Sequence, residues 1–162
     1  MRGLTDKKVF VTGAASGIGK ATARRFLEEG ALLVLCDLRP LEDTGLQGDM
    51  GAEPFSSGSS ARVRYLRADV AVEAGVQIAT KAMVDDGVDV LVNNAGITRD
   101  ASVGKLTSEQ WDSVIAVNLT AVFRLTRAAL RGMMKARHGR IISIGSVVGA
   151  MGNPGQANYC AA

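Results

Sequence analysis

The stretch VFVTGAASGIGKA, residues 9–21, decides the fold because it joins a strand pattern to a helix pattern through a glycine-rich turn. Its first letters belong to the short apolar run KVFVT (8–12), which is rich in β-branched and aromatic side chains. Nearly continuous apolar runs are typical of strands covered on both faces, as in parallel sheets. After the glycines, residues 17–29 predict a helix that ends at Gly30, a residue type suited to capping the last turn.

The same alternation continues along the chain and predicts the fold class. Further strand-like runs are RVRYL (62–66), LLVLC (32–36), VDVLV (88–92) and RIISI (140–144). Apolar residues recur at helical spacing in two sets, Val72, Val76, Ala79 and Met83, then Leu119, Val122, Phe123, Thr126, Leu130 and Met133. TSEQ (107–110) has the pattern of a capping box that opens another helix. We therefore expect a Rossmann-type, doubly wound parallel α/β sheet with helices on both faces.

One segment departs from this alternation of strand and helix patterns. Residues 40–61, PLEDTGLQGDMGAEPFSSGSSA, are rich in Gly, Ser, Asp and Glu, and they predict a mobile surface loop with one short helix. There is no internal repeat and no linker composition in the 162 residues. Length and pattern together favour a single domain over residues 1–162.

Composition excludes several classes of function. The 19 basic and 16 acidic residues give a net charge of +3, too small an excess to indicate nucleic-acid binding. The two cysteines, Cys36 and Cys160, lack metal-ligand spacing and predict free thiols, so no metal site is expected. No apolar run approaches the roughly 20 residues of a membrane span, and the N-terminus lacks a signal-peptide core. These features predict a cytoplasmic protein that does not bind membranes, and leave an organelle matrix open.

The glycine turn predicts a dinucleotide site. Gly13, Gly17 and Gly19 lie between the first strand and the first helix, where glycine lets the backbone turn tightly and approach a ligand. Free N–H groups at the start of the helix then face a pyrophosphate. A glycine-rich turn that binds no ligand can have a similar sequence. The placement between a strand and an amphipathic helix nevertheless favours a dinucleotide-binding turn.

Asp37 follows the second strand and bears on the choice of cofactor. A carboxylate there accepts hydrogen bonds from the adenosine ribose and repels a 2′-phosphate, which favours NAD(H) over NADP(H). The alternative is an aspartate that only begins the next turn. No arginine stands at position 16 or 38, but Arg39 is close enough along the chain to swing in, which keeps NADP(H) possible.

These residues together resemble the short-chain dehydrogenase/reductase superfamily. TGAASGIG (12–19) matches its TGxxxGxG form, and NNAG (93–96) follows the fourth main strand, as in the family. Asn118 lies in the long-helix region, and Ser146 and Tyr159 have the spacing of the family's catalytic pair. The resemblance covers the whole chain, and the ordered combination of motifs is more specific than any one of them.

A narrower resemblance suggests the reaction. NNAGITRD (93–100) and MMKARHGRIISIGSVVGAMGNPGQANY (133–159) are similar to 3-oxoacyl-[acyl-carrier-protein] reductases. This implies NAD(P)H-dependent reduction of a 3-oxoacyl thioester of acyl-carrier protein or coenzyme A, as in fatty-acid synthesis. Acetoacetyl-CoA reductases and NAD-linked 3-hydroxyacyl-CoA dehydrogenases share much of this sequence. Asp37 favours the NAD-linked enzymes among them.

The resemblance also assigns roles to residues. Tyr159 would donate a proton to the ketone oxygen, Ser146 would hold that oxygen by a hydrogen bond, and Asn118 would anchor a water in the proton relay. Each of the three also fits a purely structural role. The cofactor contacts implied by the family are Gly13, Ser16, Gly17, Ile18, Gly19, Asp37, Asp69, Val70, Asn94, Gly96 and Tyr159.

A basic cluster near the end of the long helix suggests a partner. It consists of Arg131, Lys135, Arg137 and Arg140, and such clusters are commonly only a solvated face. In the reductases that the chain resembles, an arginine at the Arg137 position is associated with docking an acidic acyl-carrier protein. His138, the one histidine, is predicted to lie at the surface. The resemblance further implies a homotetramer.

The family places a lysine four residues after the tyrosine, and the printed sequence ends at Ala162, one residue earlier. In the family, the region beyond supplies that lysine, the last strands and the substrate loop. We expect the segment to be part of a longer gene product. The alternatives are a truncated gene product and a nucleotide-binding subunit without catalysis.

Overall fold

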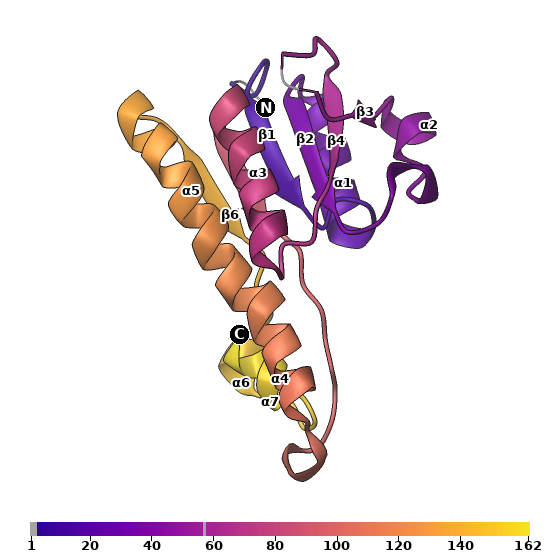
Figure 1. Cartoon of the computed structure of the whole chain (residues 1–162), viewed down its shortest axis with the longest axis vertical. Coiled ribbons are helices and arrows are strands. Elements are labelled where there is room, and N and C mark those ends of the chain that lie inside the picture. The colour runs from indigo at the N-terminus through magenta and orange to yellow at the C-terminus, as the bar shows by residue number, and fades with distance from the viewer. Residues whose placement is uncertain (1–2, 57) are drawn as a thin grey trace.

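The computed structural model describes residues 3–56 and 58–162, and within them it forms one six-stranded parallel sheet (Figure 1). The strand order is β3-β4-β2-β1-β5-β6. The strands are β1 (Lys8–Thr12), β2 (Leu32–Asp37), β3 (Glu53–Pro54), β4 (Val63–Arg67), β5 (Val90–Asn93) and β6 (Arg140–Ser143). The order reverses direction between β1 and β5, which is the switch point where ligands bind in open α/β sheets.

The helices lie between the strands, as the alternating pattern predicts. They are α1 (Gly17–Glu28), α2 (Leu46–Met50), α3 (Glu73–Asp86), α4 (Ser108–Ile115), α5 (Ala121–Ala136), α6 (Val148–Met151) and α7 (Ala157–Ala161). Two short 3₁₀ turns, η1 (Leu41–Asp43) and η2 (Val103–Lys105), and a π-helical turn, η3 (Ala116–Thr120), complete the set. The Rossmann-type fold class is therefore confirmed. The capping box at Thr107 is confirmed as well, since its hydroxyl accepts from the Gln110 N–H and the Gln110 side chain accepts from the Thr107 N–H.

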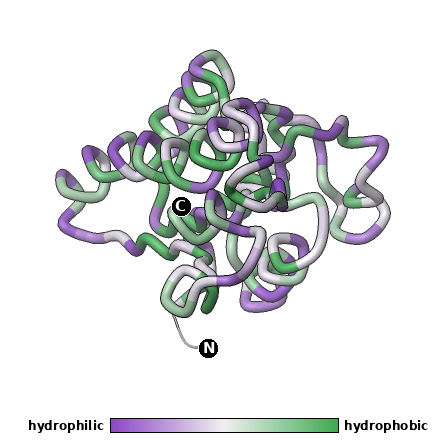
Figure 2. The backbone as a smooth tube through the Cα atoms, turned by 90° about the horizontal axis from the view of Figure 1, so that it is seen from below, coloured by the Kyte–Doolittle hydropathy of each residue, from purple (hydrophilic) through white to green (hydrophobic). Residues whose placement is uncertain are grey.

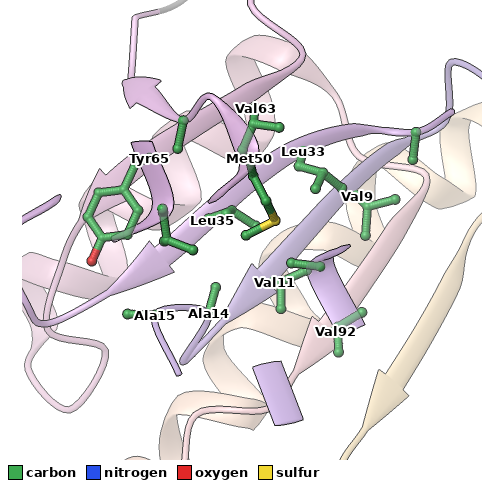
Figure 3. Packing of buried hydrophobic residues seen from close by; sticks show 14 of the residues in the cluster. Val9, Val11, Ala14, Ala15, Leu33, Leu35, Met50, Val63, Tyr65 and Val92 are labelled. Carbon is green, nitrogen blue, oxygen red and sulfur yellow. The ribbon is translucent and has the colours of Figure 1, made fainter. Parts of the chain in front are cut away.

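Alternate residues of each central strand supply two separate cores. Val9 and Val11 point to one face of the sheet, where α1 and the residues before β3 cover them (Figure 3). Phe10 and Cys36 point to the other face, beneath α3 and α5. This double burial explains why the central strands read as unbroken apolar runs rather than as an alternating pattern.

The segment at residues 40–61 is more ordered than the sequence predicts. It contains η1, α2 and the two-residue strand β3, and its side chains Leu41, Leu46 and Met50 are buried against the core beside α1. The expected short helix is confirmed as α2, but the expected surface loop is wrong for the buried residues around it, while Ser57 lies outside the described residues. The prediction failed because three widely spaced apolar residues carry the packing inside an otherwise polar composition.

The long helix α5 also differs from the prediction. Its buried residues are Ala121, Leu125, Ala129 and Met133, whereas the predicted stripe contains Leu119, Phe123 and Leu130, which are exposed. Phe123 is 58% exposed, and Met134, further along the same helix, is 74% exposed. The tube coloured by hydropathy shows green and purple segments alternating around the helices (Figure 2). Two alanines, Leu125 and Met133 therefore form the buried face, and a second apolar stripe faces outward.

Helices α4 and α5 are continuous through η3. This stretch, Ser108–Ala136, is the one helix in the described part of the chain that is long and apolar enough to cross a membrane, by length and composition alone. It packs against α3 and β5, and Arg124, Arg127 and Arg131 interrupt its outer side. Its apolar content is therefore that of a helix covering one face of the sheet.

Strand β6 is the last strand in the sheet order, and its outer edge has no partner strand among the described residues. Its pairing with β5 runs from Val90↔Arg140 to Asn93↔Ser143. Ile142 and the following Ile144 remain 41% and 42% exposed. One side of β6 therefore has an uncovered apolar surface next to the site described below.

Candidate active site

The glycine turn after β1 is built from close backbone approaches. Gly13 has φ +63°, and a Cβ atom there would lie 2.8 Å from the Cα of Ala95. A Cβ atom on Gly19 would lie 2.2 Å from the Gly13 carbonyl oxygen and 2.5 Å from Nδ2 of Asn94. Gly17 has φ +53°, and nothing lies within 4 Å of its Cβ position. Thus Gly13 and Gly19 let the turn close on itself, while Gly17 leaves space at the start of α1 for a ligand.

Asn94 and Thr12 hold this turn to the next strand. The Asn94 side-chain amide donates to the carbonyl oxygens of Thr12 and Gly13, at 3.0 and 3.1 Å. The Thr12 hydroxyl accepts from the N–H groups of Asn94 and Ala95, both at 3.0 Å. Sequence reasoning missed Thr12. Its position at the end of β1, directly before the glycines, is the signal that could have found it.

Asp37 lies at the end of β2, beside the same turn. One oxygen of its carboxylate accepts from the Ala15 N–H at 3.0 Å, and the other accepts from the Arg39 N–H at 3.2 Å. The side-chain Nε of Arg39 is 3.6 Å from Oδ1 of Asp37, the oxygen that also accepts from the Arg39 N–H. The nearby Tyr65 hydroxyl donates to the Arg39 carbonyl at 2.7 Å. The pKa of Tyr65 is raised, mainly by burial and secondly by the Asp37 carboxylate. Asp37 and Arg39 therefore form a local ion pair at the mouth of a cleft.

Asp69 and Val70 follow β4 on the same side of the sheet. The Asp69 carboxylate accepts from the Ala71 N–H at 2.9 Å, and Val70 is buried. A Cβ atom on Gly75 would lie 1.9 Å from the Asp69 carbonyl oxygen. Gly75 therefore lets α3 approach the end of β4, and sequence reasoning missed it because a lone glycine inside a helical pattern has no distinctive spacing.

These strand ends and the glycine turn enclose a cleft of about 590 Å³. The predicted cofactor contacts on its lining are Gly13, Ser16, Gly17, Ile18, Asp37, Asp69, Val70, Asn94 and Gly96. Gly19 is not on the lining, since it packs behind the turn against Gly13 and Asn94. Tyr159 is not on this lining either, and belongs to a neighbouring hollow.

The neighbouring hollow, of about 770 Å³, brings the three predicted catalytic residues together. Asn118, Ser146 and Tyr159 all line it, although they come from η3, the segment after β6, and α7. Ile18 and Asn94 line both the cleft and the hollow, so the two spaces adjoin. A ligand lying across the cleft can therefore extend toward the tyrosine.

Asn118 is fixed by its π-helical turn, an irregularity often found at functional sites. Its side-chain oxygen accepts from the Ile97 N–H at 2.9 Å, and its side-chain nitrogen donates to the Ile97 carbonyl at 3.0 Å. One N–H and one lone pair of the amide remain for another partner. Asn93, by contrast, joins structural elements, since its amide lies 3.2 Å from the Thr126 hydroxyl and 3.4 Å from the Ser143 hydroxyl.

The basic end of α5 contains a residue in an unusual backbone conformation. Arg137 ends the helix with φ +51°, a conformation that glycine adopts more readily. The His138 ring lies 3.7 Å from the Asp89 carboxylate at the surface. Among the described residues, no group of three or more His, Cys, Asp or Glu side chains is placed to hold a metal ion.

The two thiols differ sharply in environment, and we expect them to differ in reactivity. Burial raises the pKa of the Cys36 thiol to about 12, and the Asp37 and Asp69 carboxylates add to the shift. Since the thiolate is the nucleophile, Cys36 is expected to resist alkylation at pH 8, whereas the partly exposed Cys160 in the hollow reacts. Iodoacetamide followed by peptide mass spectrometry should find the adduct on Cys160 alone in folded protein and on both cysteines after denaturation.

The control for this labelling is Cys160→Ser, which should give no adduct while folded. Rapid alkylation of Cys36 in folded protein would contradict the buried environment described for it.

Comparison with known proteins places this site in a family. The sequence profile described as short chain dehydrogenase matches residues 7–162. Nodulation protein G of Rhizobium sp. (strain N33) is 46% identical over 160 residues, covering 98% of this chain and 62% of that protein. The 3-oxoacyl-[acyl-carrier-protein] reductase FabG of Vibrio cholerae is 44% identical over 161 residues, with the same coverage. The FabG of Escherichia coli (strain K12) is 44% identical over 158 residues, covering 96% of this chain and 61% of that protein. The chain thus spans about three fifths of the length of these relatives.

Proposed function

Because this chain belongs to the short-chain dehydrogenase family, we propose that it is the dinucleotide-binding part of an NAD(P)H-dependent reductase. The proposed reaction is reduction of a 3-oxoacyl thioester to the 3-hydroxyacyl form, on acyl-carrier protein or coenzyme A. Support comes from relatives named as 3-oxoacyl-[acyl-carrier-protein] reductases at 44% identity. We also propose that residues 1–162 form one domain and that the protein is cytoplasmic.

The observation that carries the proposal is the adjoining pair of spaces at the carboxyl ends of the strands. The cleft has the glycine turn at one wall and an acidic residue, Asp37, beside that turn. The hollow beside it has Tyr159 and Ser146 on its lining. The cleft fits a dinucleotide because Gly13 and Gly19 let the turn pack closely, and Gly17 leaves space at the start of α1 for the pyrophosphate.

The residues of this chain have distinct proposed roles. When bound, the nicotinamide dinucleotide supplies the hydride. The Ser146 hydroxyl donates a hydrogen bond to the substrate's ketone oxygen and stabilises the negative charge that develops there. The Tyr159 phenol donates the proton to that oxygen as a general acid. Asn118 uses its remaining N–H and lone pair to hold a water of the proton relay.

Asp37 supports a preference for NADH, and this also favours the second candidate function, an NAD-linked 3-hydroxyacyl-CoA dehydrogenase or acetoacetyl-CoA reductase. Asp37→Ala is expected to weaken NADH binding by roughly 10- to 100-fold, because a hydrogen bond to a charged group contributes about 1.5–3 kcal/mol. NADPH binding should not weaken, since the repulsion of its 2′-phosphate is removed. Fluorescence titration of both cofactors measures the two Kd values.

Two further variants make this titration specific. Asp37→Asn removes the charge but keeps an oxygen for the Ala15 N–H, so it separates charge from turn geometry. Asp43→Ala removes an exposed carboxylate on η1 and should leave the ratio of Kd values unchanged. An unchanged ratio in both Asp37 variants would exclude Asp37 as the determinant of cofactor choice.

The proposed partners use the surface of α5. The cations near Arg137 are proposed to dock an acidic acyl-carrier protein, and the exposure of Arg131, Lys135, Arg137 and Arg140 supports this role. The outward stripe of Leu119, Phe123, Leu130 and Met134 supports self-association, which we propose gives a tetramer. The direct test of the function is turnover of acetoacetyl-CoA and of an acetoacetyl-carrier protein by the complete gene product, with NADH and NADPH compared.

A further inference from the structure

Asn158, the residue before Tyr159, has a fully buried polar side chain. It is 0% exposed and lies at the second position of α7. Its side-chain nitrogen donates to the carbonyl oxygens of Arg99 at 2.9 Å and Gln110 at 3.2 Å. Its side-chain oxygen accepts from the Tyr159 N–H at 2.8 Å. Both N–H groups and the carbonyl of this amide are therefore used, although burying a polar side chain is costly unless it is bonded in this way.

These bonds join three segments that are far apart in the sequence. Arg99 lies in the loop between β5 and η2, Gln110 lies in the first turn of α4, and Asn158 lies in α7. α7 is five residues long and packs against α4 and α6, away from β2 and β4 (Figure 1). A helix of a single turn has little stability of its own, so its position depends on such contacts.

The same loop is held from its other end by Asn118. The Asn118 amide makes two hydrogen bonds to the backbone of Ile97, two residues before Arg99. Ile97 lines both the cleft and the hollow. Residues 97–99 are thus bonded to the element that carries Asn118 at one end and to the element that carries Tyr159 at the other.

We propose that Asn158 is a positioning residue, which sets the place of Tyr159 relative to Asn118 through the shared loop at residues 97–99. The consequence for catalysis rests on the proposed function, whereas the consequence for the position of Tyr159 does not. Asn158 does not line the cleft or the hollow, so it acts through the tyrosine and not on a ligand. Misplacement of a reacting group by about 1 Å can cost roughly 100-fold in rate.

The test uses Asn158→Ala and Asn158→Asp in the complete gene product, with folding checked by circular dichroism. Alanine removes every bond of the side chain. Aspartate keeps the size and the oxygen facing the Tyr159 N–H, but it lacks the amide that donates to Arg99 and Gln110, and it provides a second variant if alanine prevents folding. Hydrogen exchange at the Tyr159 amide should accelerate by roughly 10-fold or more, since local opening of α7 becomes easier.

The kinetic part separates positioning from general loosening. We expect kcat for acetoacetyl-CoA reduction to fall by roughly 100-fold, with KM and the Kd of NADH changed less than about threefold, because uniform binding is retained. Gln156→Ala is the matched control. It removes a neighbouring side-chain amide that bonds to Asp100 on the same loop, but from a partly exposed site, and both exchange and kcat should stay near wild type.

Each outcome decides the proposal. Wild-type exchange at Tyr159, or wild-type kcat, in a folded Asn158 variant overturns it. An equal loss of kcat in Gln156→Ala, or a parallel loss of NADH binding, also overturns it, because the effect would then be general. If the wild-type protein reduces no thioester, the proposed function fails, and the exchange measurement alone decides whether Asn158 positions Tyr159.

Discussion

Tyr159→Phe is expected to lower kcat for reduction of acetoacetyl-CoA by roughly 100- to 10,000-fold, the usual contribution of a general acid. The substitution removes one oxygen atom from a side chain that lines the hollow beside the cofactor cleft. The backbone bond from Tyr159 to Asn158 is independent of the phenol, so the helix should keep its place. NADH binding, measured by fluorescence titration, should change less than about threefold, because only the step that requires a proton is affected.

Tyr65→Phe is the matched control, since it makes the same chemical change at the chain's other tyrosine. The Tyr65 hydroxyl donates to the Arg39 carbonyl and does not line the hollow. Its loss should leave kcat within about threefold of wild type. Normal turnover by Tyr159→Phe would remove Tyr159 from the reaction, and the enzyme mechanism proposed above would fail with it.

Gly19→Ala is expected to have the second large effect, on cofactor binding. Its Cβ would lie 2.2 Å from the Gly13 carbonyl oxygen and 2.5 Å from the Asn94 amide nitrogen, so the turn and its bonds to Asn94 must move apart. Overpacking of this kind destabilises a fold by about 1–3 kcal/mol. Loss of one hydrogen bond between the displaced turn and the pyrophosphate should weaken NADH binding by roughly 10- to 100-fold.

Gly132→Ala is the control for adding a methyl group to a helical glycine. Gly132 lies inside α5 with nothing within 4 Å of its Cβ position, and alanine is the better helix former by about 1 kcal/mol. That variant should unfold at a slightly higher denaturant concentration and bind NADH normally. NADH binding of wild-type strength by Gly19→Ala would show that the closed turn is not required for the cofactor.

The central fold could be predicted because its strands are buried on both faces. Such strands leave long apolar runs in the sequence, and β1 and β2 occur within one residue of the expected positions. The region before β3 could not be predicted in this way, since a few scattered residues, Leu41, Leu46, Met50 and Ala52, pack it against the core. On α5, Ala121 and Ala129 share the buried face with Leu125 and Met133, and the alanines carry too little apolar weight to mark that face in the sequence.

The site divides in the same manner. Residues with a fixed spacing along the chain, such as Gly13, Ser146 and Tyr159, could be named from the sequence, and the structure places them around two adjoining spaces. Thr12 and Asn158 could not be named, because their roles depend on backbone groups brought near by folding. A hydrogen bond to a distant carbonyl leaves no pattern in a single sequence.

The open edge of β6 also affects how the 162-residue polypeptide behaves as a laboratory sample. Along this edge, the backbone N–H and carbonyl groups of one molecule can form hydrogen bonds with those of a second molecule. The exposed Ile142 and Ile144 would strengthen such a contact. Within β6, the charge of Arg140 is what opposes it. Concentrated solutions are therefore expected to precipitate slowly as β-rich material unless another polypeptide occupies that edge.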